Sequence, residues 1–360
     1  MSAQVSFTLL AIAICIFCFY VSKFLTLWIF LQSQKWMIVD DPAIDSDRKF
    51  QDKPIPLLGG LSFVFVCGLA TSLVWLIQKN NYLGLQNYLA QNLDYSFKIL
   101  WILIGGLILM VGGILDDIYT FSTKRLFLWI FVGIWVAVFL GGLSINSFSF
   151  PFDKILPHNI FLGSFLAFVW IGLCISATKF LDGHDGLVGL VGVLNFFVIA
   201  LVANFTNINQ PLIVILALIW ASGILGFLPY NVPNAKIYLG ESASEVVGFV
   251  IGVLSILSGA KIATTTGIIG WFIFDLLLVI YLRKKSGKSI FAAGREHWHF
   301  RLLDSGLDKW QVLYVTLSIL FVSSIFSLTL PTDYKLYSIL GQFVILIIIF
   351  AITDRIKKKS

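Results

Sequence analysis

The chain has 360 residues, of which 58% are hydrophobic and 12% charged, and its mean hydropathy is +0.93. A soluble domain cannot cover so much apolar surface, so the composition excludes one and predicts an all-α, polytopic integral membrane protein. The formal net charge of +6 bears first on membrane topology, and we expect no nucleic-acid partner. No segment reads as a separate soluble domain, so residues 1–360 are expected to form a single membrane-embedded domain.

Charge-free runs of about 20 residues, the length of a helix that crosses a bilayer core, recur along the chain. They predict about eleven transmembrane helices. In chain order these are residues 4–33, 57–78, 97–115, 126–143, 160–178, 186–204, 211–228, 246–260, 264–282, 311–330 and 336–353. No basic residue precedes the first run, so we expect it to be retained as a span and not cleaved as a signal peptide.

The basic residues orient these spans. Nineteen of the 25 Lys and Arg residues fall in alternate connections and in the C-terminal tail. Because positive residues are retained on the cytoplasmic side, this side is predicted to be cytoplasmic, with the N-terminus outside and the C-terminus inside.

The acidic residues are clustered on the same side. Fifteen of the 19 Asp and Glu residues fall there, although acids have little influence on topology. A functional site on the cytoplasmic face explains the clustering. Five segments supply it: residues 34–56, 116–125, 179–189, 229–245 and 283–310.

The first two segments combine acids with basic residues. The turn "PIPLLGG" is expected to present Arg48 and Lys49 at the membrane surface, where anchoring to anionic lipid is the simpler explanation. Asp116 and Asp117 are adjacent at a span end, where their repulsion beside lipid favours a divalent cation, with Lys124 close by. Neighbours on a helix point about 100° apart, so only one of the two aspartates is expected to touch the metal.

The stretch "KFLDGHDGLVG", residues 179–189, ends an apolar run. If it continues as a helix, Asp182 and Asp185 share one face. Gly183 and its neighbouring glycines allow close approach of a ligand, and the next helix offers its N-terminus to an anion. A nucleotide or a metal-bound diphosphate suits this arrangement.

The last two segments add an amide, an acid and a basic cluster. Asn231 lies in a proline-constrained loop, and Glu241 follows the flexible Gly240. His297, His299 and Arg301 alternate, so an extended chain aims them together, whereas a helix pairs only the first and the last. Phosphate binding is favoured over zinc for this cluster.

These segments, in this order and on one face, resemble the polyprenyl-phosphate N-acetylhexosamine-1-phosphate transferases (glycosyltransferase family 4). The resemblance covers about residues 40–310. Its motifs are Arg48-Lys49 before "PLLGG", the double aspartate Asp116-Asp117, the intact "DGHDGL", Asn231 ten residues before the metal-binding acid, and the basic "HWHFR".

The chain departs from the family pattern at several positions. The family often has His where Gln51 stands, Asn where Ser176 and Lys179 stand, Asp where Glu241 stands, and His where Phe300 stands. A Glu in place of an Asp keeps the charge on a longer arm, whereas Lys179 places a cation beside the nucleotide site. These changes bear on the sugar donor more than on the reaction class.

The resemblance implies transfer of an N-acetylated sugar 1-phosphate from a UDP-sugar to undecaprenyl phosphate, with release of UMP, at the start of a cell-surface glycan such as lipopolysaccharide or a cell-wall polymer. It implies Mg²⁺, with Mn²⁺ as an alternative, and a bacterial inner membrane location with the site facing the cytoplasm. It leaves open a homodimer and a covalent aspartyl intermediate.

The resemblance also assigns roles. Asp116 positions the acceptor, and Asp117 and Glu241 hold the metal. Asp182, Asp185 and Asn231 position the nucleotide, helped by Lys179 and Gly183, and His297, His299 and Arg301 hold phosphates, as do Arg48, Lys49 and Lys124. The rival interpretation is a membrane transporter or carrier with an acidic site at its cytoplasmic face, which would more naturally place acids at mid-membrane depth.

Overall fold

The computed structural model describes residues 3–36, 38–40, 53–80, 94–145, 159–205, 210–258, 262–289 and 294–357. Among them the helices are α1 (Ala3–Trp36), α2 (Leu61–Lys79), α4 (Asp94–Tyr119), α5 (Thr123–Trp135), α6 (Ile160–Leu181), α7 (Leu187–Phe205), α8 (Pro211–Phe227), α9 (Glu241–Leu257), α10 (Ile262–Lys285), α11 (Trp298–Asp304), α12 (Lys309–Thr329) and α13 (Thr332–Lys357). A π-helical turn, Val136–Leu140, extends α5, and a 3-10 turn, Leu228–Tyr230, follows α8. The strands β1 (Val39–Asp40) and β2 (Ile55–Pro56) pair antiparallel.

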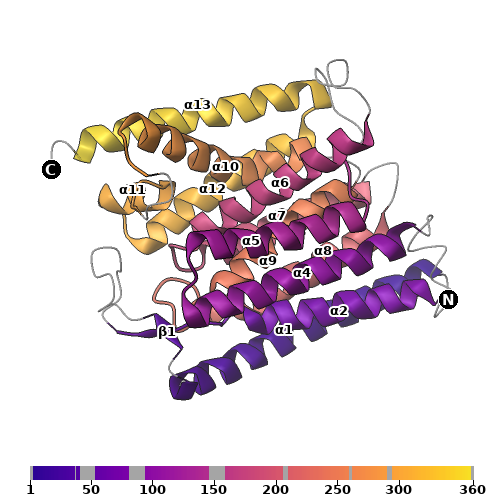
Figure 1. Ribbon diagram of the computed structural model, residues 1–360. Helices are drawn as coiled ribbons and strands as arrows, with labels where there is room; N and C mark the ends of the chain where they lie inside the picture. Colours follow the sequence, from indigo (N-terminus) through magenta and orange to yellow (C-terminus); the bar gives the residue numbers. More distant parts are fainter. Residues whose placement is uncertain are drawn as a thin grey trace.

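The long helices lie side by side in one bundle (Figure 1). α1 begins at one end of the bundle, and α13 ends at the other. β1 and α11 lie at the second end, which we call the α11 end. This confirms a polytopic helical protein.

Ten helices among the described residues are long and apolar enough to cross a membrane. The remaining predicted span, 246–260, corresponds to α9, which has 17 residues and runs Glu241–Leu257. The prediction began too late because Ser242, Ser244 and Glu245 suggest a loop. These polar residues are instead buried inside the protein, where Ser242 and Ser244 make hydrogen bonds and Glu245 makes an ion pair.

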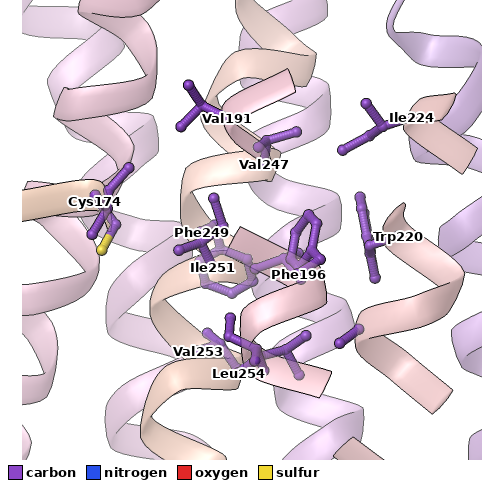
Figure 2. Close-up of a cluster of buried hydrophobic side chains, with 14 of the residues drawn as sticks. Cys174, Val191, Phe196, Trp220, Ile224, Val247, Phe249, Ile251, Val253 and Leu254 are labelled. Carbon is purple, nitrogen blue, oxygen red and sulfur yellow. The ribbon is translucent and has the colours of Figure 1, made fainter. Parts of the chain in front are cut away.

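α9 lies in the interior of the bundle, and every residue from Ser242 to Leu257 is buried. Figure 2 shows Val247 and Phe249 among the buried side chains of α9, together with Phe196 of α7, Trp220 of α8 and Cys174 of α6. The Phe196 and Trp220 rings lie 6.3 Å apart between centroids. Because lipid is as apolar as these side chains, close packing holds α9 in place more than the hydrophobic effect does.

Two glycines bring α9 close to its neighbours. A side chain on Gly113 of α4 would collide with the backbone of Ser242, and one on Gly248 of α9 would collide with Thr178 and the α6 backbone. Small residues at such contacts let helix backbones approach closely. The α11 ends of α4 and α6 are therefore held against the first turns of α9.

The predicted turn "PLLGG" packs against the loop that precedes α9. The N–H of Gly59 donates to the carbonyl of Tyr238, and the N–H of Gly60 donates to that of Leu239, both at 2.9 Å. A side chain on either glycine would overlap this loop. The turn and the loop before α9 therefore form one surface beside the helix ends.

Candidate active site

A cavity of about 520 Å³ lies among the helix ends at the α11 end of the bundle. Many of the predicted site residues line it. They are Asp117, Lys179, Asp182, Gly183, Asp185, Asn231, Glu241 and His297. Residues up to 180 positions apart in sequence thus form one wall, as expected from the five segments.

Asp117 links α4 to the start of α9. Its carboxylate accepts hydrogen bonds from the N–H of Glu241 at 3.0 Å and from the hydroxyl of Ser242 at 3.4 Å. A carboxylate at a helix N-terminus satisfies free amides and favours the helix dipole. Asp116 points elsewhere and accepts from the N–H of Phe121, so the two aspartates diverge, as helical geometry predicted.

Lys179, in the last turn of α6, bridges two glutamates of α9. Its Nζ lies 2.6 Å from Oε2 of Glu241 and 2.8 Å from Oε1 of Glu245. The two glutamates are four residues apart and thus lie on the same face of the helix. The cation that replaces the family's asparagine is therefore paired with the glutamate that replaces the family's aspartate.

The "DGHDG" stretch is a turn and not a helix, because α6 ends at Leu181 and α7 begins at Leu187. Gly186 has a φ of +74°, a conformation that favours glycine. The condition for Asp182 and Asp185 to share a helical face, a helix that continues through this stretch, is therefore not met. The turn places both carboxylates on the cavity wall by another route.

Asp185 and Asn231 join this turn to the loop before α9. Asp185 accepts from Nζ of Lys309 at 2.8 Å and from the N–H groups of Asn234 and Ala235 at 3.2 and 3.4 Å. The Asn231 amide accepts from the N–H of Gly186 and donates to the carbonyl of Ile237. Through these hydrogen bonds, both side chains join the turn to the loop and fix the shape of the cavity wall.

Asp182 is set apart by its electrostatic surroundings. Burial raises the pKa of its carboxyl well above the usual range, and the negative charges of Glu241 and Asp117 raise it further. These surroundings favour the protonated carboxyl over the carboxylate, and a protonated carboxyl is a hydrogen-bond donor. When it carries a proton, Asp182 can donate to a phosphate oxygen in the cavity.

His297 is held by Asp275 of α10. The Nδ1 atom of His297 lies 2.9 Å from Oδ2 of Asp275, while Oδ1 accepts from the N–H of Trp298. The ring of Phe180 stacks on the imidazole at 4.6 Å between centroids. With Nδ1 directed to the carboxylate, Nε2 is the imidazole atom left for a ligand.

His299 lies behind the cavity wall. It is 1% exposed, and a side chain on Gly183 would contact its Nε2 atom. Burial lowers the pKa of His299 well below its usual value, and the neighbouring His184 lowers it further. A neutral, enclosed His299 supports the turn at Gly183, and it is not among the cavity-lining residues.

Arg301 does not reach the cavity. Its Nη1 donates to Asp354 at 2.6 Å and its Nε to the carbonyl of Glu296 at 2.7 Å, while the guanidinium lies 4.0 Å from the Phe350 ring centroid. Residues 298–304 form α11, so the extended arrangement that would align the basic residues is absent there. Arg301 connects α11 to α13 in this structure.

The remaining predicted basic residues lie elsewhere or are not described. Lys124 is exposed at the start of α5 and is not among the cavity-lining residues. Arg48, Lys49 and Gln51 lie outside the described residues.

Neither Lys309 nor Asp275 was singled out for the site from the sequence. The signal for Asp275 is its position, since it is an acid within the long apolar stretch of α10. Lys309 immediately precedes an apolar run, where a basic residue ordinarily marks an interface. The spacing of neither residue indicates its partner.

The carboxylates of the wall suit Mg²⁺ as an open site. No group of three or more His, Cys, Asp or Glu in the described part of the chain is placed to hold a metal. Mg²⁺ in phosphoryl-transfer sites is ordinarily bound by one or two carboxylates and completed by substrate phosphates and water. Asp117 and Glu241 supply two carboxylates on the cavity wall, and an oxygen of the adjacent Glu245 is buried without a hydrogen-bond partner. These residues can therefore hold a metal ion that is also bound by oxygens of a substrate.

Comparisons with known proteins identify relatives of this chain. The model of "Glycosyl transferase family 4" matches residues 99–259, the stretch from α4 to the end of α9. A Bacillus subtilis protein named probable undecaprenyl-phosphate N-acetylglucosaminyl 1-phosphate transferase is 30% identical over 354 residues, 94% of this chain and 92% of the relative.

A second relative is the phospho-N-acetylmuramoyl-pentapeptide-transferase of Staphylococcus aureus. It is 27% identical over 188 residues, 51% of this chain and 56% of the relative. Because the likeness to the Bacillus subtilis protein extends over nearly the whole of both chains, this chain belongs to glycosyl transferase family 4, the polyprenyl-phosphate N-acetylhexosamine-1-phosphate transferases.

Proposed function

We propose that the protein transfers an N-acetylated sugar 1-phosphate from a UDP-sugar to undecaprenyl phosphate and releases UMP, as the initiating step of a cell-surface glycan or cell-wall polymer. The observation that carries this proposal is the cavity in which Asp117, Asp182 and Glu241 meet His297 at one end of a membrane bundle. The names of both relatives, which specify N-acetylated sugar phosphates, support it.

The membrane position suits two substrates of opposite character. The acceptor is a lipid whose phosphate lies at the interface, and the donor is a water-soluble nucleotide. The α11 end carries the basic connections, among them Arg283, Lys284 and Lys285 at the end of α10. By the positive-inside rule we place the cavity on the cytoplasmic face of the bacterial plasma membrane.

The reaction requires no strong general base. The acceptor is a phosphate monoester with a second pKa of about 6, so most of it is already a dianion at neutral pH. Its oxygen bonds to the β-phosphorus of the donor, and the bond from that phosphorus to the oxygen bridging to UMP breaks. The protein contributes mainly positioning and charge stabilisation.

The residues of the wall divide this work. His297, oriented by Asp275, holds a phosphate oxygen through Nε2, and a protonated Asp182 donates a hydrogen bond to another. Asp185 and Asn231 hold the turn between α6 and α7 and the loop before α9 in fixed positions around the nucleotide. Asp116, which faces the turn after α4, remains our candidate for positioning the acceptor.

Mg²⁺, or Mn²⁺ in its place, would be held by Asp117 and Glu241 together with substrate oxygens, and it would spread the negative charge of the diphosphate. The N–H of Glu241 and the hydroxyl of Ser242, bonded to Asp117, fix that carboxylate at the start of α9.

The test is turnover by the purified protein. It is incubated with Mg²⁺, undecaprenyl phosphate and each of a panel of UDP-sugars, and UMP is assayed. UMP release with at least one N-acetylated sugar, dependent on the lipid, is the expected result. No UMP with any UDP-sugar would count against the proposal.

A matched pair of variants links the activity to the cavity. Asp182→Ala should lose UMP release, because the methyl group cannot donate the hydrogen bond to a phosphate oxygen. Asp304→Ala makes the same chemical change to a residue that pairs with Arg295 outside the cavity, and it should retain activity. Equal activity in the two variants would remove Asp182 from the site.

A further inference from the structure

Lys179 makes two ion pairs that differ in their surroundings. The side chain of Glu245 is 0% exposed, whereas that of Glu241 is 40% exposed, and Lys179 itself is 17% exposed. One ammonium group is therefore shared between an enclosed carboxylate and one that faces the cavity.

The bond to Glu245 anchors Lys179. The other oxygen of Glu245 is buried without a hydrogen-bond partner, and Lys179 is the cation that contacts this carboxylate. Removing one partner of a buried ion pair leaves an uncompensated charge and is strongly unfavourable. Lys179 is thus expected to stay on Glu245.

The ion pair between Lys179 and Glu241 is the one that another cation can replace. Solvent screens an ion pair whose carboxylate is this exposed, and Glu241 lines the cavity with Asp117. A divalent cation bound at Glu241 would compete with the Lys179 ammonium for the same carboxylate and would be repelled by its charge. Two ligands that compete for one group lower each other's apparent affinity to the same extent.

We propose that Lys179 is a built-in cation that occupies Glu241 in the free protein and holds its affinity for divalent metals low. This inference rests on the proposed function, since it concerns the carboxylates expected to hold the metal. The consequence is that metal binding depends on the oxygens brought by the diphosphate substrate. Lys179 acts through Glu241 and is a positioning residue.

The test measures Mn²⁺ binding by electron paramagnetic resonance on the purified full-length protein, without nucleotide or lipid substrate. Lys179→Met removes the charge and keeps much of the side-chain length. Because a like charge is lost beside the metal position, the Mn²⁺ dissociation constant should fall by about fivefold or more. Adding Glu241→Gln to this variant should abolish the tightened binding.

Lys309→Met is the matched control. It removes one positive charge from the same cavity, where Lys309 pairs with Asp185 and not with Glu241. Its Mn²⁺ affinity should change by less than about twofold, because that carboxylate also accepts two backbone N–H groups. Equal tightening in Lys179→Met and Lys309→Met would show a general charge effect and overturn the proposal.

A double variant protects the test against misfolding. If Lys179→Met does not fold, a double variant that combines Lys179→Met with Glu245→Gln is used. It replaces the buried ion pair by neutral groups and leaves Glu241 intact, and we expect the same fall in the Mn²⁺ dissociation constant. Affinity that is unchanged or weaker than that of the unsubstituted protein, in whichever variant folds, overturns the proposal. Because the Mn²⁺-binding measurement needs no sugar donor, its result does not depend on whether the protein releases UMP.

Discussion

Asp275 holds His297 by a 2.9 Å contact from Oδ2 to Nδ1, and both side chains are buried at about 6% exposure. The same carboxylate accepts the N–H of Trp298, the first residue of α11. One acid thus fixes both the imidazole and the start of the short helix that follows it.

Asp275→Asn is expected to lower kcat/KM by about 10- to 100-fold, the usual effect of losing the partner that orients a functional histidine. The amide can still accept from Trp298, so the fold should persist. The measurement is steady-state UMP release across a range of pH. Asp275→Glu, which restores the charge, should recover part of the activity, and a variant with full activity and an unchanged pH profile would contradict this role.

Gly240→Ala should disrupt the contact between Asp117 and the start of α9. Gly240 has φ of +87° and ψ of 156°, a region open essentially to glycine alone, where another residue costs about 1–3 kcal/mol. A Cβ there would also lie 2.9 Å from Oδ2 of Asp117. UMP release should fall by about tenfold or more, since loss of one fixed charge contact is worth that much.

Gly287→Ala provides the comparison. Gly287 also has a positive φ, +70°, but nothing lies within 4 Å of an added Cβ. This variant should show some loss of thermal stability and unchanged activity. Loss of activity in both variants to the same degree would mean that backbone strain, and not the contact with Asp117, is responsible.

Asp117→Asn and Asp185→Asn should each abolish turnover while leaving the protein extractable and folded. Asp117 would lose the charge that faces the α9 N-terminus, and Asp185 would lose its ion pair with Lys309. UMP assays are run beside size-exclusion chromatography in detergent. Near wild-type turnover in either variant would take that residue out of the reaction.

Most of the fold was predictable because apolar runs of sufficient length specify membrane helices in the absence of any other signal. The start of α9 was not. Its first turn contains Ser242, Ser244 and Glu245, residue types that favour caps and loops in water. Inside the bundle they are bonded to Asp117, to the carbonyl of Glu241 and to Lys179.

The residues of the site were more predictable than their partners. The motifs singled out Asp117, Asp185 and Asn231, and all three line the cavity. The pairing of Lys179 with Glu245 joins positions 66 residues apart, and that of Asp275 with His297 joins positions 22 apart. Such pairs depend on how helices cross, which spacing along one helix does not determine.

His299 should make stability fall in mild acid. Burial lowers its pKa well below the usual histidine value of about 6.5, so below about pH 6.5 the unfolded chain binds a proton that the folded protein does not. Stability is therefore present above that pH and is lost as the pH falls. The melting temperature should drop between about pH 7 and pH 5.5 more steeply in the unsubstituted protein than in His299→Gln.

The comparison between these two proteins isolates His299 from other groups. Asp182 has a raised pKa and gives the opposite trend, since a raised acid favours the folded state as pH falls, but it is present in both proteins. Equal slopes for the two proteins would show that His299 accepts a proton in the folded state.

Arg301→Met separates a structural role from phosphate binding. Its guanidinium bonds Asp354 and the Glu296 carbonyl and lies over Phe350, so its loss should lower stability by about 1–2 kcal/mol, allowing for the 56% exposure of Asp354. KM for the UDP-sugar and for undecaprenyl phosphate should stay within about twofold, because no phosphate contact is lost. Asp354→Asn, which keeps the positive charge, should show part of the same loss of stability. If Arg301 holds a phosphate instead, KM should rise by about tenfold with little change in melting temperature, because a charge-assisted hydrogen bond to substrate is worth that much.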